Sequence, residues 1–296
     1  MLNTALTRSG LGSRLQLRMR TVQRALRGNP NMLLGLVLVL FVAFLAIFAS
    51  YLDKPEGPGN INPFVRLQAP DGEHWFGTDL MGRDVYSRSL HGSRLSLSVG
   101  VTVAIIVMAA GAFIGVPAGY FRQLDNVIMR FMDGLMAFPS FLLAIALVAI
   151  LGPSFKNVVI ALSLTGMPPI VRIVRGSVLS LREAQYVEAA RAIGANPLRV
   201  LASHIFPQVV APLVVGGTFI FAGSILTEAG LSFLGTGIPP ITPSWGNMMG
   251  ESKIYANISV WTLFFPGLMI AITVLGINLV GDGLRDALDP KLRRRQ

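Results

Sequence analysis

The chain has 296 residues, of which 52% are hydrophobic and 14% charged, and its mean hydropathy is +0.61. Soluble domains carry about 25% charged residues, and the apolar residues here lie in blocks between short polar stretches, which argues against a water-soluble fold and predicts one all-α membrane domain. The net charge of +10 comes from Lys and Arg residues between these blocks rather than from one basic face, so nucleic acid is not expected as a partner. Without cysteine the chain can form neither disulfides nor thiolate metal sites, and no metal site is predicted.

The amino-terminal segment 1–30 carries six arginines and no acid, and a long apolar block follows it. This order resembles a secretory signal peptide. The block is too long for one, however, and Ala43, Ala46 and Ala49 fall at every third position rather than in an A-x-A cleavage site. We therefore predict a basic cytoplasmic segment over 1–30, followed by an uncleaved first span in contact with membrane lipid.

Uncharged stretches long enough to cross the hydrocarbon, which takes about 20 helical residues, predict about six spans. The spans are expected near 32–52, 96–120, 134–153, 157–176, 206–228 and 260–281. The fourth lies in the shortest stretch and becomes long enough because Arg172 and Arg175 can extend their side chains to the headgroups. Pro168 and Pro169 inside it predict a kinked helix that neighbouring helices surround.

Two external segments, 53–95 and 229–258, are longer than simple connections. In the first, residues 74–95 are expected to form an external helix on the membrane surface, with Asp84 and Arg88 as an i,i+4 ion pair. Eight of the 22 residues from 229 to 250 are Gly or Pro, so the second is predicted to be a structured loop that packs on protein or lies outside the bilayer.

The distribution of charge predicts the orientation of the chain. With the amino terminus in the cytoplasm, the cytoplasmic segments hold 18 Lys and Arg residues and the external segments hold 7, as the positive-inside rule requires. Both termini are then cytoplasmic, with a membrane domain over 31–283 and a tail over 284–296.

The cytoplasmic segment 177–204 is longer than joining two helices requires, which indicates a function. Its pattern predicts a helix over 182–193, a left-handed helix end at Gly194, and a second helix capped by Asn196 with Pro197 at its first position. The apolar face of the first helix is expected to consist of Leu181, Val187, Ala190 and Ile193. Such a unit is suited to docking on a partner, and the alternative is an amphipathic helix lying on the inner leaflet.

The residues of this segment resemble a known motif. Glu188-Ala189-Ala190, Gly194 four positions later and then Ile205 and Pro207 are similar to the EAA loop of ATP-binding cassette (ABC) importer permeases. The resemblance implies that these six residues belong to the surface that couples the permease to its ATPase. The family pattern ends in Ile-x-Leu-Pro, whereas this chain has His204 and Phe206 at the Ile and Leu places.

Further motifs resemble the C-type subunit of the dipeptide, oligopeptide and nickel permeases. They lie at 74–79, 82–84, 87–88, 231–235, 243–248 and 281–290. The resemblance implies a type I ABC importer permease fold in a multi-pass protein of the bacterial inner membrane. It also implies a B-type permease as heterodimer partner, two ATPase subunits that bind ATP and Mg, and an external substrate-binding protein. The expected docking residues for that protein are Trp75, Arg83, Asp84, Trp245 and Asn247.

Glu228 is the acid that lies nearest to a span interior, which makes it a candidate for the transport pathway, with an interfacial helix-end carboxylate as the alternative. No catalytic residues are predicted, because the chain has neither a Walker A nor an H-E-x-x-H sequence, and this chain is expected to bind no cofactor itself. The expected function is import of dipeptides or oligopeptides by alternating access. The alternative cargo is nickel, glutathione or another small solute. The alternative class of protein is an ion-coupled secondary transporter. It is a distant alternative, because such transporters use charges inside the membrane and the predicted spans contain almost none.

Overall fold

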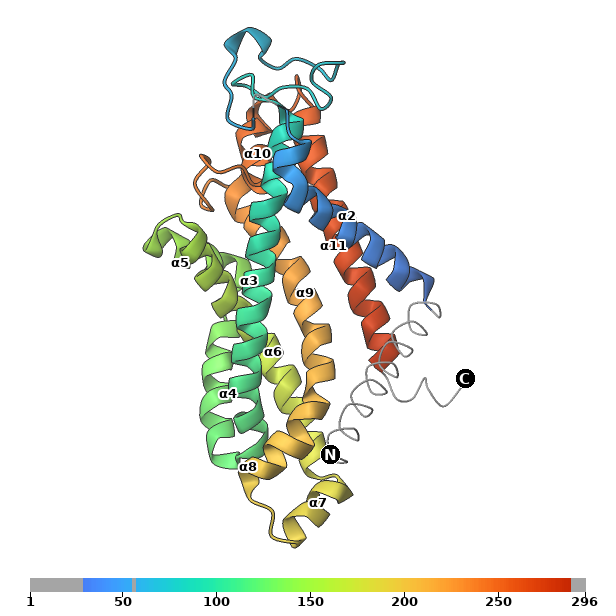
Figure 1. Ribbon diagram of the computed structural model, residues 1–296. Helices are drawn as coiled ribbons and strands as arrows, with labels where there is room; N and C mark the ends of the chain where they lie inside the picture. The colour runs from blue at the N-terminus through green and yellow to red at the C-terminus, as the bar shows by residue number, and fades with distance from the viewer. Residues whose placement is uncertain (1–28, 55–56, 289–296) are drawn as a thin grey trace, which may run out of the picture.

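The computed structural model describes residues 29–54 and 57–288, and over these ranges the chain is built from helices joined by turns and loops. The predicted basic segment 1–30 lies outside the described residues except for its last two, and the predicted tail 284–296 is described only as far as Leu288. Figure 1 shows an elongated bundle in which the long helices run from one end of the molecule towards the other.

Five helical segments in the described ranges are long and apolar enough to cross a membrane. They are α2 (Pro30–Leu52), α3 (Val85–Tyr120), α6 (Phe155–Arg182), the continuous segment Pro197–Phe233 that ends in α9 (Phe206–Phe233), and α11 (Trp261–Leu288). Each of them coincides with one of the predicted spans to within one residue at the start or contains it entirely, so the all-α membrane fold is confirmed. Pro168 and Pro169 do not interrupt α6, which continues through both for 28 residues.

The predicted span 134–153 is wrong as a single helix. The structure has two helices there, α4 (Arg122–Met136) and α5 (Ser140–Leu151), which meet at an angle of 86°. Pro139 explains the break, because proline lacks the N–H that a continuing helix needs and its own backbone leaves the helical region at ψ 125°. A sharply bent pair of helices therefore takes the place of the predicted straight span.

Helix α3 also differs from the prediction. The expected helix on the membrane surface and the expected span 96–120 form one helix of 36 residues, which rises about 54 Å and exceeds the roughly 30 Å hydrocarbon core. Its outer half is held upright because it packs on protein. Four serines on that half are buried, namely Ser87, Ser89, Ser93 and Ser96. The predicted surface helix and the predicted span are therefore one continuous helix that is longer than the hydrocarbon core is thick.

Helix α3 is the centre of the bundle and packs along α6 and α9. Its contact with α6 is close because glycines on α3 face β-branched residues on α6. The facing residues are Gly111 with Ile170, Gly115 with Val174 and Gly119 with Val178. A Cβ atom at Gly115 would lie 2.8 Å from the Cβ atom of Val174. This arrangement of small residues lets two membrane helices approach backbone to backbone.

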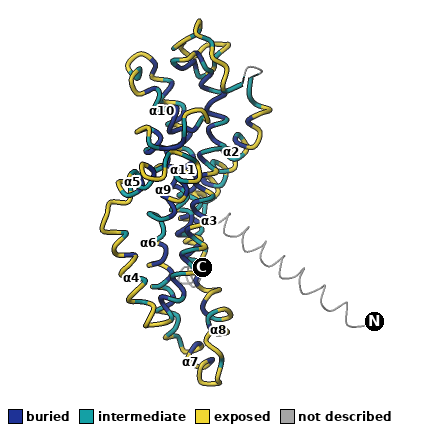
Figure 2. Tube along the Cα trace, turned by 90° about the vertical axis from the view of Figure 1, so that its left-hand side faces the viewer, coloured by how far each residue is buried: buried dark blue, intermediate teal, exposed yellow. Residues whose placement is uncertain are grey.

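The two ends of the bundle carry different structures (Figure 1). At one end lie α7 (Gln185–Ala192) and α8 (Pro197–Val200), which a short π-helix (Leu201–Ile205) joins to α9. At the other end lie residues 57–84 and the segment 236–258, which together we call the outer cap. The predicted loop 229–258 holds more helix than expected, since α9 reaches Phe233 and α10 (Trp245–Ser252) follows. Buried positions follow the interior of the bundle, whereas α7 and α8 are largely exposed (Figure 2).

Candidate functional site

The unit formed by α7, the turn after it and α8, residues 185–200, is called here the α7–α8 knob. Gly194 ends α7 with a φ of +83°, as predicted, in a left-handed conformation that glycine adopts without steric cost. The Ala195 amide donates to the Ala190 carbonyl at 3.0 Å and the Gly194 amide to the Arg191 carbonyl at 2.9 Å, the two bonds of a Schellman motif. The Asn196 side chain then caps α8 as predicted, accepting from the Leu198 amide at 3.0 Å.

The surface of the knob is divided between the bundle and solvent. Val187 and Ala190 are buried in the main core cluster, whereas Glu188 and Ala189 are exposed. The predicted apolar face is divided, because Ile193 is the C-cap residue beyond the last turn of α7 and is 86% exposed. Residues Glu188, Ala189 and Ile193 are therefore available to a partner.

The knob is attached to the bundle at several points. Ile205, at the end of the π-helix, is completely buried, while Pro207 on the first turn of α9 is exposed. The Arg191 guanidinium lies 5.0 Å from the Tyr120 ring centre at the end of α3. Arg182, in the last turn of α6, donates to the Gly119 carbonyl at 3.3 Å. A force on the knob consequently reaches α3, α6 and α9.

In the outer cap, Asp84 is the N-cap of α3. It accepts from the Ser87 amide at 2.9 Å and from Lys54 Nζ at 2.7 Å, and His74 Nδ1 lies 2.8 Å from it. Burial raises the pKa of Asp84, but the hydrogen bonds from these three partners outweigh burial and hold the pKa below its usual value. The predicted ion pair between Asp84 and Arg88 is wrong, since both side chains have other partners.

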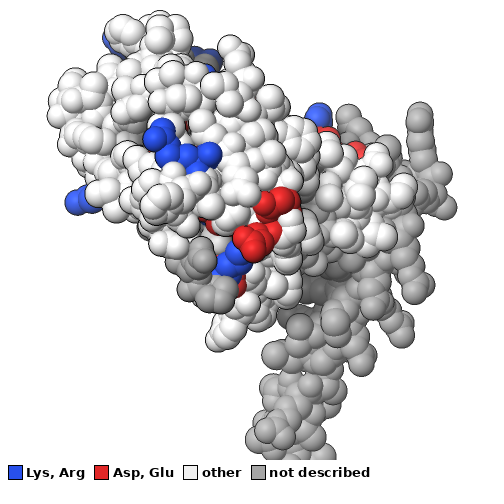
Figure 3. Space-filling view, turned by 90° about the horizontal axis from the view of Figure 1, so that it is seen from above, with Lys and Arg blue, Asp and Glu red and all other residues white. Residues whose placement is uncertain are grey.

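Arg88 instead links the loop before α3 to α10. Its Nη1 atom lies 2.5 Å from Asp79 Oδ2 and 2.8 Å from Glu251 Oε2. Arg83 bonds to the same two carboxylates, at 2.7 and 2.6 Å. Figure 3, which views the molecule from this end, shows acidic and basic side chains together on a mostly uncharged surface. The two arginines thus bind two parts of the outer cap that are far apart in sequence.

The five predicted docking residues do not form one surface. Trp75 is 57% exposed and can contact a partner. Asp84, Trp245 and Asn247 are buried, and Arg83 is occupied by its carboxylates. Trp245 donates from Nε1 to the carbonyl of Ser89 in α3 at 3.1 Å, as expected of a core residue. Spacing could not reveal this, because burial of these residues depends on the outer half of α3 standing upright beside α10.

Glu228 is completely buried, which corrects its expected place at an exposed helix end. Helix α9 continues beyond it to Phe233, and Glu228 Oε1 accepts from Ser232 at 2.8 Å and from Ser244 at 3.1 Å. Ser244 is the N-cap of α10, so the carboxyl group joins α9 to the outer cap. The side chain does not line the pocket described next, so its expected place on a pathway has no support in this conformation.

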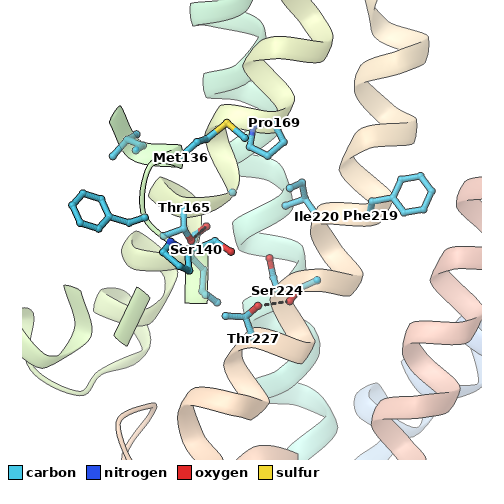
Figure 4. A pocket seen from close by; sticks show the side chains of 14 residues that line it. Met136, Ser140, Thr165, Pro169, Phe219, Ile220, Ser224 and Thr227 are labelled. Atoms are coloured by element: carbon cyan, nitrogen blue, oxygen red, sulfur yellow. Dashed lines mark hydrogen bonds between the residues drawn. The ribbon is translucent and has the colours of Figure 1, made fainter. Parts of the chain in front are cut away.

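A pocket of about 410 Å³ lies where the α4–α5 bend meets α6 and α9. Figure 4 shows the side chains that line it, with Ser140, Thr165, Ser224 and Thr227 as its hydroxyl-bearing members. None of these residues was predicted from the sequence to form a site. The available signals were Pro139, which breaks the helix, and hydroxyl groups within apolar spans.

Residues 93–294 match the family described as binding-protein-dependent transport system inner membrane component. The chain is 43% identical over 275 residues to the dipeptide transport system permease protein DppC of Alkalihalophilus pseudofirmus. That alignment covers 93% of this chain and 90% of the relative. It is also 43% identical over 273 residues to the glutathione transport system permease protein GsiD of Pectobacterium atrosepticum, covering 92% of this chain and 90% of that protein.

Among solved structures, the chain resembles a chain of the MetNI methionine ABC transporter, whose structure shows inward-facing conformations. The TM-score is 0.57, and the match covers 68% of this chain and 96% of that one. At 18% identity this likeness concerns the fold alone. The family match and the relatives together show that the chain belongs to the binding-protein-dependent transport system inner membrane components and is a C-type permease subunit of the peptide branch of ABC importers.

Proposed function

We propose that this chain, paired with a B-type permease, lines the import pathway for short peptides across the bacterial inner membrane. The relatives support this cargo, because one is named for dipeptides and another for glutathione, itself a tripeptide. Both similarities extend over at least nine-tenths of each chain.

The proposed partners follow from the two ends of the bundle. Two ATPase subunits, which bind ATP and Mg, receive the knobs of the two permeases in the cytoplasm. A substrate-binding protein meets the outer cap, where Trp75 is exposed. Both chain termini are cytoplasmic in this arrangement, as the excess of Lys and Arg predicts. This chain itself performs no hydrolysis and binds no nucleotide.

The observation that carries the proposal is the exposed knob joined to a helix that traverses the bundle. The helical segment Pro197–Phe233 is continuous, so movement of α8 is transmitted along α9. At the far end, Glu228 and Ser244 connect α9 to α10. Closure of the ATPases would thus move α9 and the outer cap together and open the pathway outward, and hydrolysis would return it inward.

The test uses Glu188→Ala and Gly194→Val in the purified complex. Glu188 is exposed on the knob, so its loss is expected to weaken ATPase docking. Valine at Gly194 must adopt a positive φ, which costs roughly 1–2 kcal/mol and distorts the turn. Both variants should lower ATP-dependent uptake of a labelled dipeptide into vesicles at least tenfold, through lost ATPase subunits or ATP hydrolysis without uptake.

Glu183→Ala is the matched control, because Glu183 is an exposed acid close to α7 but outside the motif. It should leave assembly and uptake at the wild-type level. Normal assembly and uptake in Glu188→Ala and Gly194→Val would show that the knob is not the coupling element.

A further inference from the structure

The pocket at the α4–α5 bend lies partway along two of the helices that are long and apolar enough to cross a membrane, α6 and α9. Thr165 lies ten residues after the outer start of α6, and Thr227 six residues before the outer end of α9, which corresponds to about 15 and 9 Å along the two helices. Its volume of about 410 Å³ falls in the usual range of small-ligand sites, about 300–1,000 Å³. A cavity of this size at this depth can hold a small solute in transit.

The hydroxyl groups of the pocket come from three separate parts of the chain (Figure 4). Ser140 begins α5, Thr165 belongs to α6, and Ser224 and Thr227 belong to α9. Thr165 donates to the Ala161 carbonyl at 3.0 Å and Thr227 to the Gly223 carbonyl at 2.8 Å, which leaves lone pairs on both oxygens. These groups converge on one space although they are far apart in sequence.

Ser224 is the most informative of them. Its side chain is only 6% exposed and lines the pocket, yet its hydroxyl makes no hydrogen bond with any other described residue. Because Ser224 lines the pocket, its hydroxyl can bond to solvent or to a ligand in that space. The pocket therefore offers Ser224 to a bound molecule.

We propose that this pocket is the passage for the cargo and that its hydroxyl groups bind the peptide main chain, an inference that rests on the proposed import of peptides. Thr165 and Thr227 can accept from amide N–H groups of the cargo, and Ser224 can donate to one of its carbonyls, whatever the cargo's side chains. Binding of this kind suits a passage that must accept many peptides.

The same lining disfavours a bare metal cation as cargo. None of the described residues that line the pocket is charged, and histidine is absent from them as well. Nickel and related cations prefer imidazole, thiolate or carboxylate ligands. Without an ion pair to hold the charged ends of a peptide, the cargo is bound weakly and can leave.

The first experiment exploits the absence of cysteine from the chain, which makes every introduced thiol unique in this subunit. Thr227→Cys tests the pocket with a cationic, membrane-impermeant thiol reagent applied to the complete complex in proteoliposomes. Leu226→Cys and Ile225→Cys are its neighbours on the same helix, where Leu226 is 51% exposed away from the pocket and Ile225 is buried. We expect the reagent to modify Cys at 227 alone, and saturating dipeptide to slow that reaction at least threefold.

A second experiment separates hydrogen bonding from shape. Thr227→Val keeps the shape of the side chain and removes the hydroxyl, whereas Thr227→Ser keeps the hydroxyl. Loss of one hydrogen bond should raise the KM for dipeptide uptake about fivefold in Thr227→Val, and Thr227→Ser should retain the wild-type KM.

The outcomes distinguish this inference from the proposed function. If the wild-type complex imports dipeptide but Cys at 227 is unreactive, or reacts at a rate that dipeptide does not change, the pocket is not the passage and only this inference fails. An unchanged KM in Thr227→Val would overturn the role of the hydroxyl. If the wild-type complex imports no dipeptide at all, the proposed function fails and this inference fails with it.

Discussion

Single residues in this protein derive their roles from partners that lie far away in the chain. Asp84 caps α3 and also receives Lys54 and His74, so one carboxylate fixes the start of the central helix to two loop positions. Glu228 likewise joins α9 to Ser244. Their surroundings, rather than their residue types, separate these two acids from the exposed Glu188.

Asp84→Asn is predicted to destabilise the protein in a pH-dependent way. The amide keeps the shape but loses the charge-assisted bonds, worth about 1.5–3 kcal/mol each in favourable cases, so at pH 5 the thermal midpoint in detergent should be lower than that of wild type. Because the folded-state pKa of Asp84 lies below the ordinary 3.8, its contribution is complete above that value and is lost as the pH falls further. The difference in midpoint between the two proteins should thus shrink below pH 3.8. A difference that stays constant down to pH 3 would contradict the role given to the charge.

Helices α3 and α6 share the most extensive contact among the described elements of the bundle. Glycines on α3 face Ile170, Val174 and Val178 on α6, and the fit leaves no room for added atoms. The bend between α4 and α5 is the second important arrangement of helices, because the pocket lies beside it and is lined by α6 and α9 as well.

Gly115→Ala is expected to separate α3 from α6, since its Cβ atom would lie 2.8 Å from Val174 and 3.0 Å from the Val171 carbonyl. Overpacking of this kind costs about 1–3 kcal/mol, and the thermal midpoint of the detergent-solubilised protein should fall accordingly. Gly176→Ala is the matched control, because nothing lies within 4 Å of its added Cβ atom. It should be neutral or slightly stabilising in a helix. Equal midpoints for both variants would refute the close contact.

The whole molecule places an exposed knob at one end and a braced outer cap at the other, with α9 running between them (Figure 1). The arginine pair Arg83 and Arg88 holds the loop before α3 to α10 through Asp79 and Glu251. The outer cap is therefore expected to move as a unit with α3 and α9.

The orientation of this assembly is predicted to put the knob inside the cell. Two exposed isoleucines are suitable positions for a cysteine that tests this orientation. Ile193 in the knob is 86% exposed, and Ile241 in the outer cap is 94% exposed. A membrane-impermeant maleimide should label Ile241→Cys in spheroplasts. It should label Ile193→Cys only in inverted vesicles from which urea has stripped the ATPases. Labelling of Ile193→Cys in intact spheroplasts would reverse the proposed topology.

Hydropathy and local pattern were sufficient to predict the fold class, the positions of the five long membrane helices and the helix–turn–helix of the knob. These features depend on near neighbours in the chain: a long apolar run satisfies its backbone as a helix in lipid, Gly194 accepts a left-handed turn, and Asn196 caps the helix that follows. The motif around Glu188 also pointed to the family before any contact was known.

Tertiary structure alone decided which polar residues are buried, which are paired and where space remains. Arg88 lies four residues from Asp84, but it bonds to Asp79 and Glu251 because α10 folds back beside α3. Trp245 and Asn247 look like surface residues in a Gly- and Pro-rich loop and are core residues for the same reason. The pocket lies where the bend at Pro139 meets α6 and α9. Each of these outcomes depends on contacts between residues distant in sequence, which periodicity and spacing do not encode.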